Sequence, residues 1–190
     1  MGVQPETEKK ENISPVVKEW LLANRTGKLH SAQWRELVTE PLVPLLLLMV
    51  PGIMLLRSFI VSLFVGSFWM VGIAGLVSLA FMLIIRARRY ARLPIQVATL
   101  RAIKQPPPTW MFWKAWEFDT AAGTKLFLHK SLLPDHIVLE SGKNYLVYYL
   151  SESDRHILLS LAASDHPDSG KWQPTTEFRE RLKRRTSVRT

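Results

Sequence analysis

Histidine can act as a general acid, a general base or a metal ligand. The spacing of the histidines in this chain matches no catalytic or metal-binding motif. The chain has five of them: His30, His129, His136, His156 and His166. No two stand four residues apart beside a carboxylate on one expected helix, as zinc-binding HExxH segments require. His129, Asp135 and His136 flank one expected loop, where metal binding or proton transfer is the alternative to an ordinary surface. Segment 164–166 has the residue types of a catalytic triad, but adjacent residues cannot take up triad geometry.

Other signatures of enzymes and cofactor sites are also missing from the sequence. It has no GxGxxG, GxxxxGK[ST] or GxSxG segment, so dinucleotide, phosphate-loop and nucleophile-elbow chemistry have no sequence support. The chain contains no cysteine, which excludes disulfides and thiolate metal sites. We therefore predict that the protein is not an enzyme and holds no cofactor and no metal ion.

An aromatic cluster is the clearest candidate for a binding site. It consists of Trp110, Phe112, Trp113, Trp116 and Phe118. On a strand, the four members at even positions share one face, while Trp113 lies on the other. Three interpretations remain open: the core of a barrel with bilayer anchors, a stacking platform for single-stranded nucleic acid, and a groove for a protein or peptide.

A long apolar segment separates this cluster from the N-terminal part of the chain. Residues 42–85 include a single charged residue, Arg57. As one helix the segment would be about 66 Å long, roughly twice the ~30 Å hydrocarbon core of a bilayer. We therefore expect a two-span transmembrane hairpin over residues 38–86, with spans near 38–56 and 64–85.

Small residues at intervals of four indicate how the two spans would pack. They are Ser58, Ser62, Gly66, Ala74 and Ser78. Small side chains allow helices to approach closely within a membrane. One interpretation is that the hairpin packs against itself, and the alternative is contact between copies in a homo-oligomer.

The basic residues predict an orientation for the hairpin. The net charge is +9, and residues 86–190 contain 18 Lys and Arg against 10 Asp and Glu. Four arginines directly follow the second span: Arg86, Arg88, Arg89 and Arg92. The positive-inside rule then places both termini in the cytoplasm. We expect these four arginines to contact anionic lipid head groups.

Polar segments precede the hairpin. Residues 1–13 contain no apolar stretch, so we expect a disordered N-terminus and not a cleavable signal peptide. In the next segment, 14–40, Ser14 is a suitable helix N-cap, Gly27 a helix stop and Ser31 a second cap. This pattern predicts a short helix-turn-helix before the membrane.

After the hairpin, the apolar period changes from that of a helix to that of a strand. Segments with strand character lie over 95–103, 110–118, 124–129, 144–150 and 156–161. Turn residues separate them about every ten residues, a spacing typical of small all-β barrels. We expect an OB-like or SH3-like barrel over residues 93–162, followed by a basic tail over residues 163–190.

One part of this region resembles a known group of proteins. Gly142, Tyr145 and segment 147–150, followed by segment 157–160, resemble the closing hairpin of barrel domains in uncharacterised bacterial two-span membrane proteins. Residues 38–162 are also similar, more loosely, to NfeD-like proteins, which carry an OB-type barrel after membrane helices. The resemblance implies an integral protein of the bacterial inner membrane, with a cytoplasmic barrel of no assigned activity.

These observations favour a non-enzymatic integral membrane scaffold or accessory subunit. It would display its β-barrel in the cytoplasm for interaction with a protein partner, whose identity the sequence does not specify. The alternative is a membrane-tethered protein that binds nucleic acid through an OB-like barrel.

Overall fold

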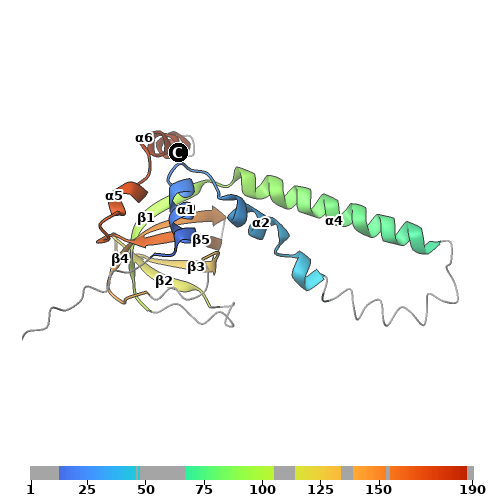
Figure 1. Ribbon diagram of the computed structural model, residues 1–190, viewed down its shortest axis with the longest axis horizontal. Coiled ribbons are helices and arrows are strands. Elements are labelled where there is room, and N and C mark those ends of the chain that lie inside the picture. The colour runs from blue at the N-terminus through green and yellow to red at the C-terminus, as the bar shows by residue number, and fades with distance from the viewer. Residues whose placement is uncertain are drawn as a thin grey trace, which may run out of the picture. The chain divides into compact units, whose positions relative to one another are not determined.

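The computed structural model describes residues 13–45, 47, 67–104, 114–133, 139–152 and 155–187 (Figure 1). The chain divides into two compact units. The barrel unit contains the described residues of Met1–His30 and Pro94–Thr190, and the helical unit contains those of Ser31–Leu93. The expected disordered segment 1–13 lies outside the described residues except for its last residue.

The barrel unit contains a closed barrel of five strands in the order β1-β2-β3-β5-β4. The strands are β1 (Ile95–Ala102), β2 (Trp116–Thr120), β3 (Lys125–Ser131), β4 (Asn144–Glu152) and β5 (Arg155–Ala163). Strands β3 and β5 pair in parallel, and the other four pairs are antiparallel. The prediction of a small all-β barrel is confirmed.

The second strand differs from its expected position. We predicted a strand over 110–118, and β2 instead begins at Trp116 and continues to Thr120. The hairpin between β2 and β3 closes through a hydrogen bond from the Thr120 amide to the Thr124 carbonyl, 2.9 Å long. Gly123 takes a positive φ of 75° in this turn. The turn is therefore shorter than the apolar pattern indicated.

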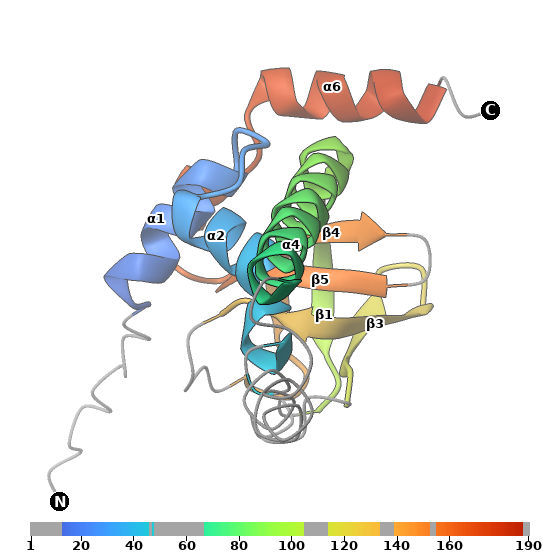
Figure 2. The same cartoon turned by 90° about the vertical axis from the view of Figure 1, so that its right-hand side faces the viewer.

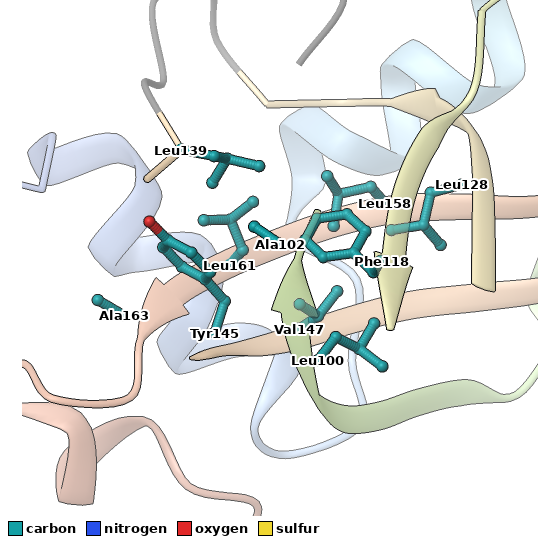
Figure 3. Close-up of a cluster of buried hydrophobic side chains, with 10 residues drawn as sticks. All are labelled: Leu100, Ala102, Phe118, Leu128, Leu139, Tyr145, Val147, Leu158, Leu161 and Ala163. Carbon is teal, nitrogen blue, oxygen red and sulfur yellow. The ribbon is translucent and has the colours of Figure 1, made fainter. Parts of the chain in front are cut away.

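The barrel core is filled by side chains from all five strands and by Leu139, which precedes β4. Figure 3 shows ten core side chains: Leu100, Ala102, Phe118, Leu128, Leu139, Tyr145, Val147, Leu158, Leu161 and Ala163. The Tyr145 hydroxyl accepts a hydrogen bond from the Glu140 amide, 2.9 Å long. This bond satisfies the polar end of a side chain that is otherwise buried among apolar groups.

Helix α1 (Pro15–Asn24) packs on β5, so that this strand is covered on both faces. The helix buries Val17, Trp20 and Leu21. The Asn24 amide donates a hydrogen bond to the Ser160 hydroxyl, 2.8 Å long and buried. The structure therefore places α1 in the barrel unit, whereas the sequence analysis grouped it with residues 25–40 as one segment before the membrane.

The C-terminal segment also packs within the barrel unit. It forms α5 (Ser169–Trp172) and α6 (Thr176–Ser187), in the region that we described only as a basic tail. The Tyr148 hydroxyl donates a hydrogen bond to the Trp172 carbonyl, 2.6 Å long and buried. The Thr175 amide donates to the Arg25 carbonyl, 3.1 Å away. These bonds join the C-terminal segment to both β4 and the end of α1.

The helical unit consists of α2 (Ser31–Thr39) and α4 (Ser67–Arg92), which contact each other (Figure 2). Arg86 connects them: its Nε donates to the Leu37 carbonyl, 2.7 Å away, and its guanidinium pairs with the Glu40 carboxylate. Among the described residues, no helix combines the length and the apolar character needed to cross a bilayer. Much of the expected first span and the turn with Arg57 lie outside the described residues.

The turn after α1 provides a test of how the C-terminal segment packs. Gly27 has a φ of 76°, and a Cβ built there would lie 2.6 Å from a ring carbon of Phe178. Gly27→Ala should therefore destabilise the barrel unit by about 1–2 kcal/mol through the backbone, and by a further ~1–3 kcal/mol through overpacking. Thermal unfolding of the full chain, followed by tryptophan fluorescence, measures the loss.

Gly123→Ala is the matched control. Gly123 has a φ of 75°, but a Cβ there would meet nothing within 4 Å. It should therefore cost only the backbone part of the penalty. Equal losses for the two variants would show that Phe178 does not pack on this turn.

Candidate functional site

The most distinctive surface of the described chain is the apolar side of α4. Seven large apolar side chains are exposed there: Ile73, Leu76, Val77, Phe81, Met82, Ile84 and Ile85. Leu76, for example, is 68% exposed. So many large exposed apolar side chains on one helix are unusual on a protein surrounded by water. In other proteins, exposed apolar surfaces often mark sites of contact with lipid or with another protein.

The four arginines at the end of α4 have different environments. Arg86 is tied to α2 through Leu37 and Glu40, and its guanidinium lies 5.2 Å from the centre of the Tyr90 ring. The side chains of Arg88, Arg89 and Arg92 are exposed. Arg89 and Arg92 also lie in the last turn, where a positive charge interacts favourably with the helix dipole.

The sequence predicted that these four arginines are equivalent contacts for lipid head groups. In the structure, Arg86 also holds α2 against α4 through its contacts with Leu37 and Glu40. This role was invisible in the sequence because Glu40 and Leu37 lie far from Arg86 along the chain.

The small residues of the predicted spans are only partly described. Ala74 and Ser78 lie on the exposed surface of α4. Ser58, Ser62 and Gly66 fall outside the described residues. Ala74 and Ser78 lie one turn apart on α4, and helix–helix packing through the five positions stays a prediction.

The structure also describes only part of the aromatic cluster. Phe118 is completely buried in the barrel core, and Trp116 is partly buried and packs against that core. Trp110, Phe112 and Trp113 lie outside the described residues. Of the three interpretations, the barrel core is therefore the one that describes Phe118, because a buried ring cannot stack on a nucleic-acid base.

Sequence analysis missed a different aromatic residue, Phe127 on β3. It is 43% exposed and lies opposite Glu117 of β2 in the strand register. Its neighbours on the same face of β3 are Lys125 and His129, both exposed. The sequence signal for Phe127 is its alternation with Leu128: adjacent residues on a strand point to opposite faces, so when Leu128 is buried, Phe127 lies on the outer face.

The outer face of β2 and β3 carries both signs of charge. Glu117 lies there with an ion pair to Lys104 at 3.6 Å. Asp119 stands opposite Lys125 in the strand register. Phe127 is therefore surrounded by both acidic and basic side chains on this face.

Among the described histidines, His156 and His129 interact through their charges. Burial lowers the pKa of His156, and the charge of His129 lowers it further. The ring of His156 contacts Tyr149 edge-on, with ring centres 5.6 Å apart. The described part of the chain holds no group of three or more side chains suited to a metal ion. Asp135 and His136 lie outside the described residues.

His166 and Tyr148 have structural roles. The Nδ1 of His166 accepts a hydrogen bond from the Asp168 amide at 3.0 Å, and its ring lies 4.7 Å from that of Trp172. Burial raises the pKa of Tyr148 far above its usual value, although Arg25 and Arg179 oppose this shift. The Tyr148 hydroxyl therefore stays protonated and serves as a donor to the C-terminal segment.

Comparison of the chain with protein-family models, with curated proteins and with solved structures found no match. We therefore infer function from the surface of α4 and from the faces of the barrel.

The His156 environment predicts a pH dependence of stability. Because the pKa of His156 is below its ordinary value of 6.5 in the folded chain, the unfolded chain binds a proton at a higher pH. The free energy of unfolding should therefore fall as the pH drops below about 6.5, and the contribution is fully present above it. Thermal unfolding of the full chain between pH 5 and pH 8 measures this dependence.

His156→Asn should make that dependence weaker. His129→Gln should weaken it less, because burial is the larger cause of the shift and the charge of His129 the smaller. If the wild type and His156→Asn lost stability equally on acidification, His156 would not be responsible.

Proposed function

We propose that this protein is a non-enzymatic membrane scaffold or accessory subunit. Residues 38–86 anchor it as a two-span hairpin with both termini in the cytoplasm, and the barrel unit is displayed there to a protein partner. The observation that carries this proposal is the exposed apolar surface of α4, which leads directly into an arginine-rich last turn.

The order of apolar and basic residues along α4 supports the membrane anchor. From Ile73 to Ile85 the helix rises about 18 Å, close to the ~15 Å of half a hydrocarbon core. Arg88, Arg89 and Arg92 then follow at the level where phosphate groups would lie. Each arginine near an anionic membrane surface contributes about 1 kcal/mol of attraction.

The strand order supports an OB-like barrel as the displayed module. Strands β1, β2 and β3 are joined in sequence, and β4 returns to lie beside β1. This gives the spatial order β4-β1-β2-β3 that defines a Greek key. The OB-fold is a five-stranded Greek-key barrel.

The surface of the barrel supports a protein as the partner. Its core is packed with side chains, so a ligand would have to bind on the outside. Phe127 provides an exposed aromatic anchor there, and Lys125 and Glu117 provide charges of both signs around it. Aromatic anchors with a polar rim are typical of protein interfaces.

The alternative function is binding of nucleic acid by a membrane-tethered barrel. The face of strands 2 and 3 is where OB-folds bind oligonucleotides, and Phe127 lies on this face. The basic residues of α6, among them Arg179 and Arg181, would add attraction for phosphate. Against this, Glu117 and Asp119 lie close to Phe127 on β2 and would repel phosphate.

The membrane topology can be tested in cells. Reporters fused before Met1 and after Thr190 should both give cytoplasmic signals, and a tag between Arg57 and Val61 should be labelled from outside. Cell fractionation should find the full chain in the membrane fraction. Opposite locations of the two ends, or recovery in the soluble fraction, would refute the anchor.

The role of the barrel surface can be tested by affinity capture from native membranes. Phe127→Ala in the full chain should reduce recovery of the partner at least about tenfold, the effect of losing ~1.4 kcal/mol of binding free energy. Val16→Ala is the matched control, because Val16 is 44% exposed but lies on α1.

Two results would count against a protein partner at this surface. One is equal recovery with wild type, Phe127→Ala and Val16→Ala. The other is retardation of single-stranded nucleic acid by the full chain in detergent, lost as salt rises and abolished by Phe127→Ala. The second result would instead establish the alternative function.

A further inference from the structure

An open hollow on α4 joins its apolar surface to its basic end. Its volume is about 310 Å³, and it is lined by Ser78, Phe81, Met82, Ile85, Arg86, Arg89 and Tyr90. The apolar side chains come first along the helix, and the two guanidinium groups and the tyrosine follow. The hollow therefore offers an apolar surface at one end and positive charge at the other.

Helix periodicity explains why these residues share one hollow. Each of positions 78, 81, 82, 85 and 89 lies three or four residues from at least one other in this set, so they lie on one side of a helix. Arg88 and Arg92 belong to the same basic cluster but do not line the hollow. The structure therefore separates Arg89 from Arg88, although the two are neighbours in the sequence and both are exposed.

We propose that this hollow is the binding site of one anionic phospholipid. The phosphate would lie at Arg86 and Arg89, and an acyl chain would follow Ile85, Met82 and Phe81 toward the membrane interior. This inference rests on the proposed membrane location and extends it from a general attraction of arginines for lipid to one defined site.

The cationic end suits a phosphate group. Guanidinium groups bind phosphate through paired N–H donors, and the side chains of Arg86 and Arg89 both line the hollow. Arg86 already uses its Nε and part of its guanidinium on Leu37 and Glu40. These bonds hold the Arg86 side chain in place, so less conformational entropy is lost when a phosphate binds beside it.

The apolar end favours a lipid over a free phosphate ion. Ser78 and Arg89 are separated by about 17 Å along the helix axis, at ~1.5 Å per residue. A phosphate ion would contact only the last turn of this segment, whereas a phospholipid would contact its whole length. Phe81 is 64% exposed and would gain the most from being covered by an acyl chain.

Native mass spectrometry of the full chain in detergent tests the proposal. With phosphatidylglycerol added, the wild type should retain one lipid per chain. Arg89→Ala should weaken retention about tenfold, while Arg88→Ala, which removes the same charge, should leave it within about twofold. Phosphatidylcholine, which has no net charge, should be retained less well by the wild type.

A second pair of variants tests the apolar end. Phe81→Ser should weaken retention of phosphatidylglycerol, because Phe81 lines the hollow. Ile84→Ser is its control, since Ile84 is 51% exposed and does not line the hollow. Glycerol phosphate, which has the head group without acyl chains, should not displace the lipid at the same concentration.

Equal effects of Arg88→Ala and Arg89→Ala, or displacement by glycerol phosphate, would overturn the defined site. So would a wild type that retains no phosphatidylglycerol. Cell fractionation of the same variants separates this failure from that of the proposed function. A chain in the membrane fraction without selective lipid would refute only the site, whereas a chain in the soluble fraction would refute the membrane anchor.

Discussion

The barrel unit depends on the burial of both faces of β5. This strand pairs with β4 on one side and in parallel with β3 on the other, and so closes the barrel. Its inner face contributes Leu158 and Leu161 to the core, and its outer face is covered by α1. A parallel pair requires a long connection, and here that connection includes β4. Without β5 the meander of β1, β2 and β3 would have an open edge and no cover.

Buried hydrogen bonds then set how the ends of the chain attach to this barrel. Asn24 bonds to Ser160 beneath α1, and Tyr148 bonds to the Trp172 carbonyl beneath α5. Removing one partner of such a bond leaves a buried polar group unsatisfied, at a cost of about 1–3 kcal/mol. The net contribution of such a hydrogen bond to stability is small, but any other arrangement of these segments would leave its buried polar groups without partners. They therefore select one arrangement for α1 and α5 on the barrel.

In the helical unit, the contacts of a charged side chain, Arg86, likewise select one arrangement of the helices. Arg86 is engaged by a carbonyl and a carboxylate of the segment around α2, so its position is defined before any ligand binds. The remaining basic residues at the end of α4 are exposed and follow a surface of large apolar side chains. A helix of this composition is stable at a boundary between hydrocarbon and phosphate, which is the basis of the proposed anchor and of the proposed lipid site.

The sequence by itself determined the features that depend on residue type and local period. Alternation over 95–103 was enough to predict β1, and an apolar run after turn residues was enough to predict β4 over 144–150. Turn residues about every ten positions were enough to predict a small barrel. The apolar segment 42–85, with Arg57 as its single charged residue, and the arginines after it were also evident. Only the tertiary structure decided which faces are covered, because alternation distinguishes the two faces of a strand but does not say which one meets the core. It buried Phe118, exposed Phe127 and packed α1 on β5. It also distinguished Arg86 from Arg88 and Arg89, since contacts between residues distant along the chain leave no local signal in the sequence.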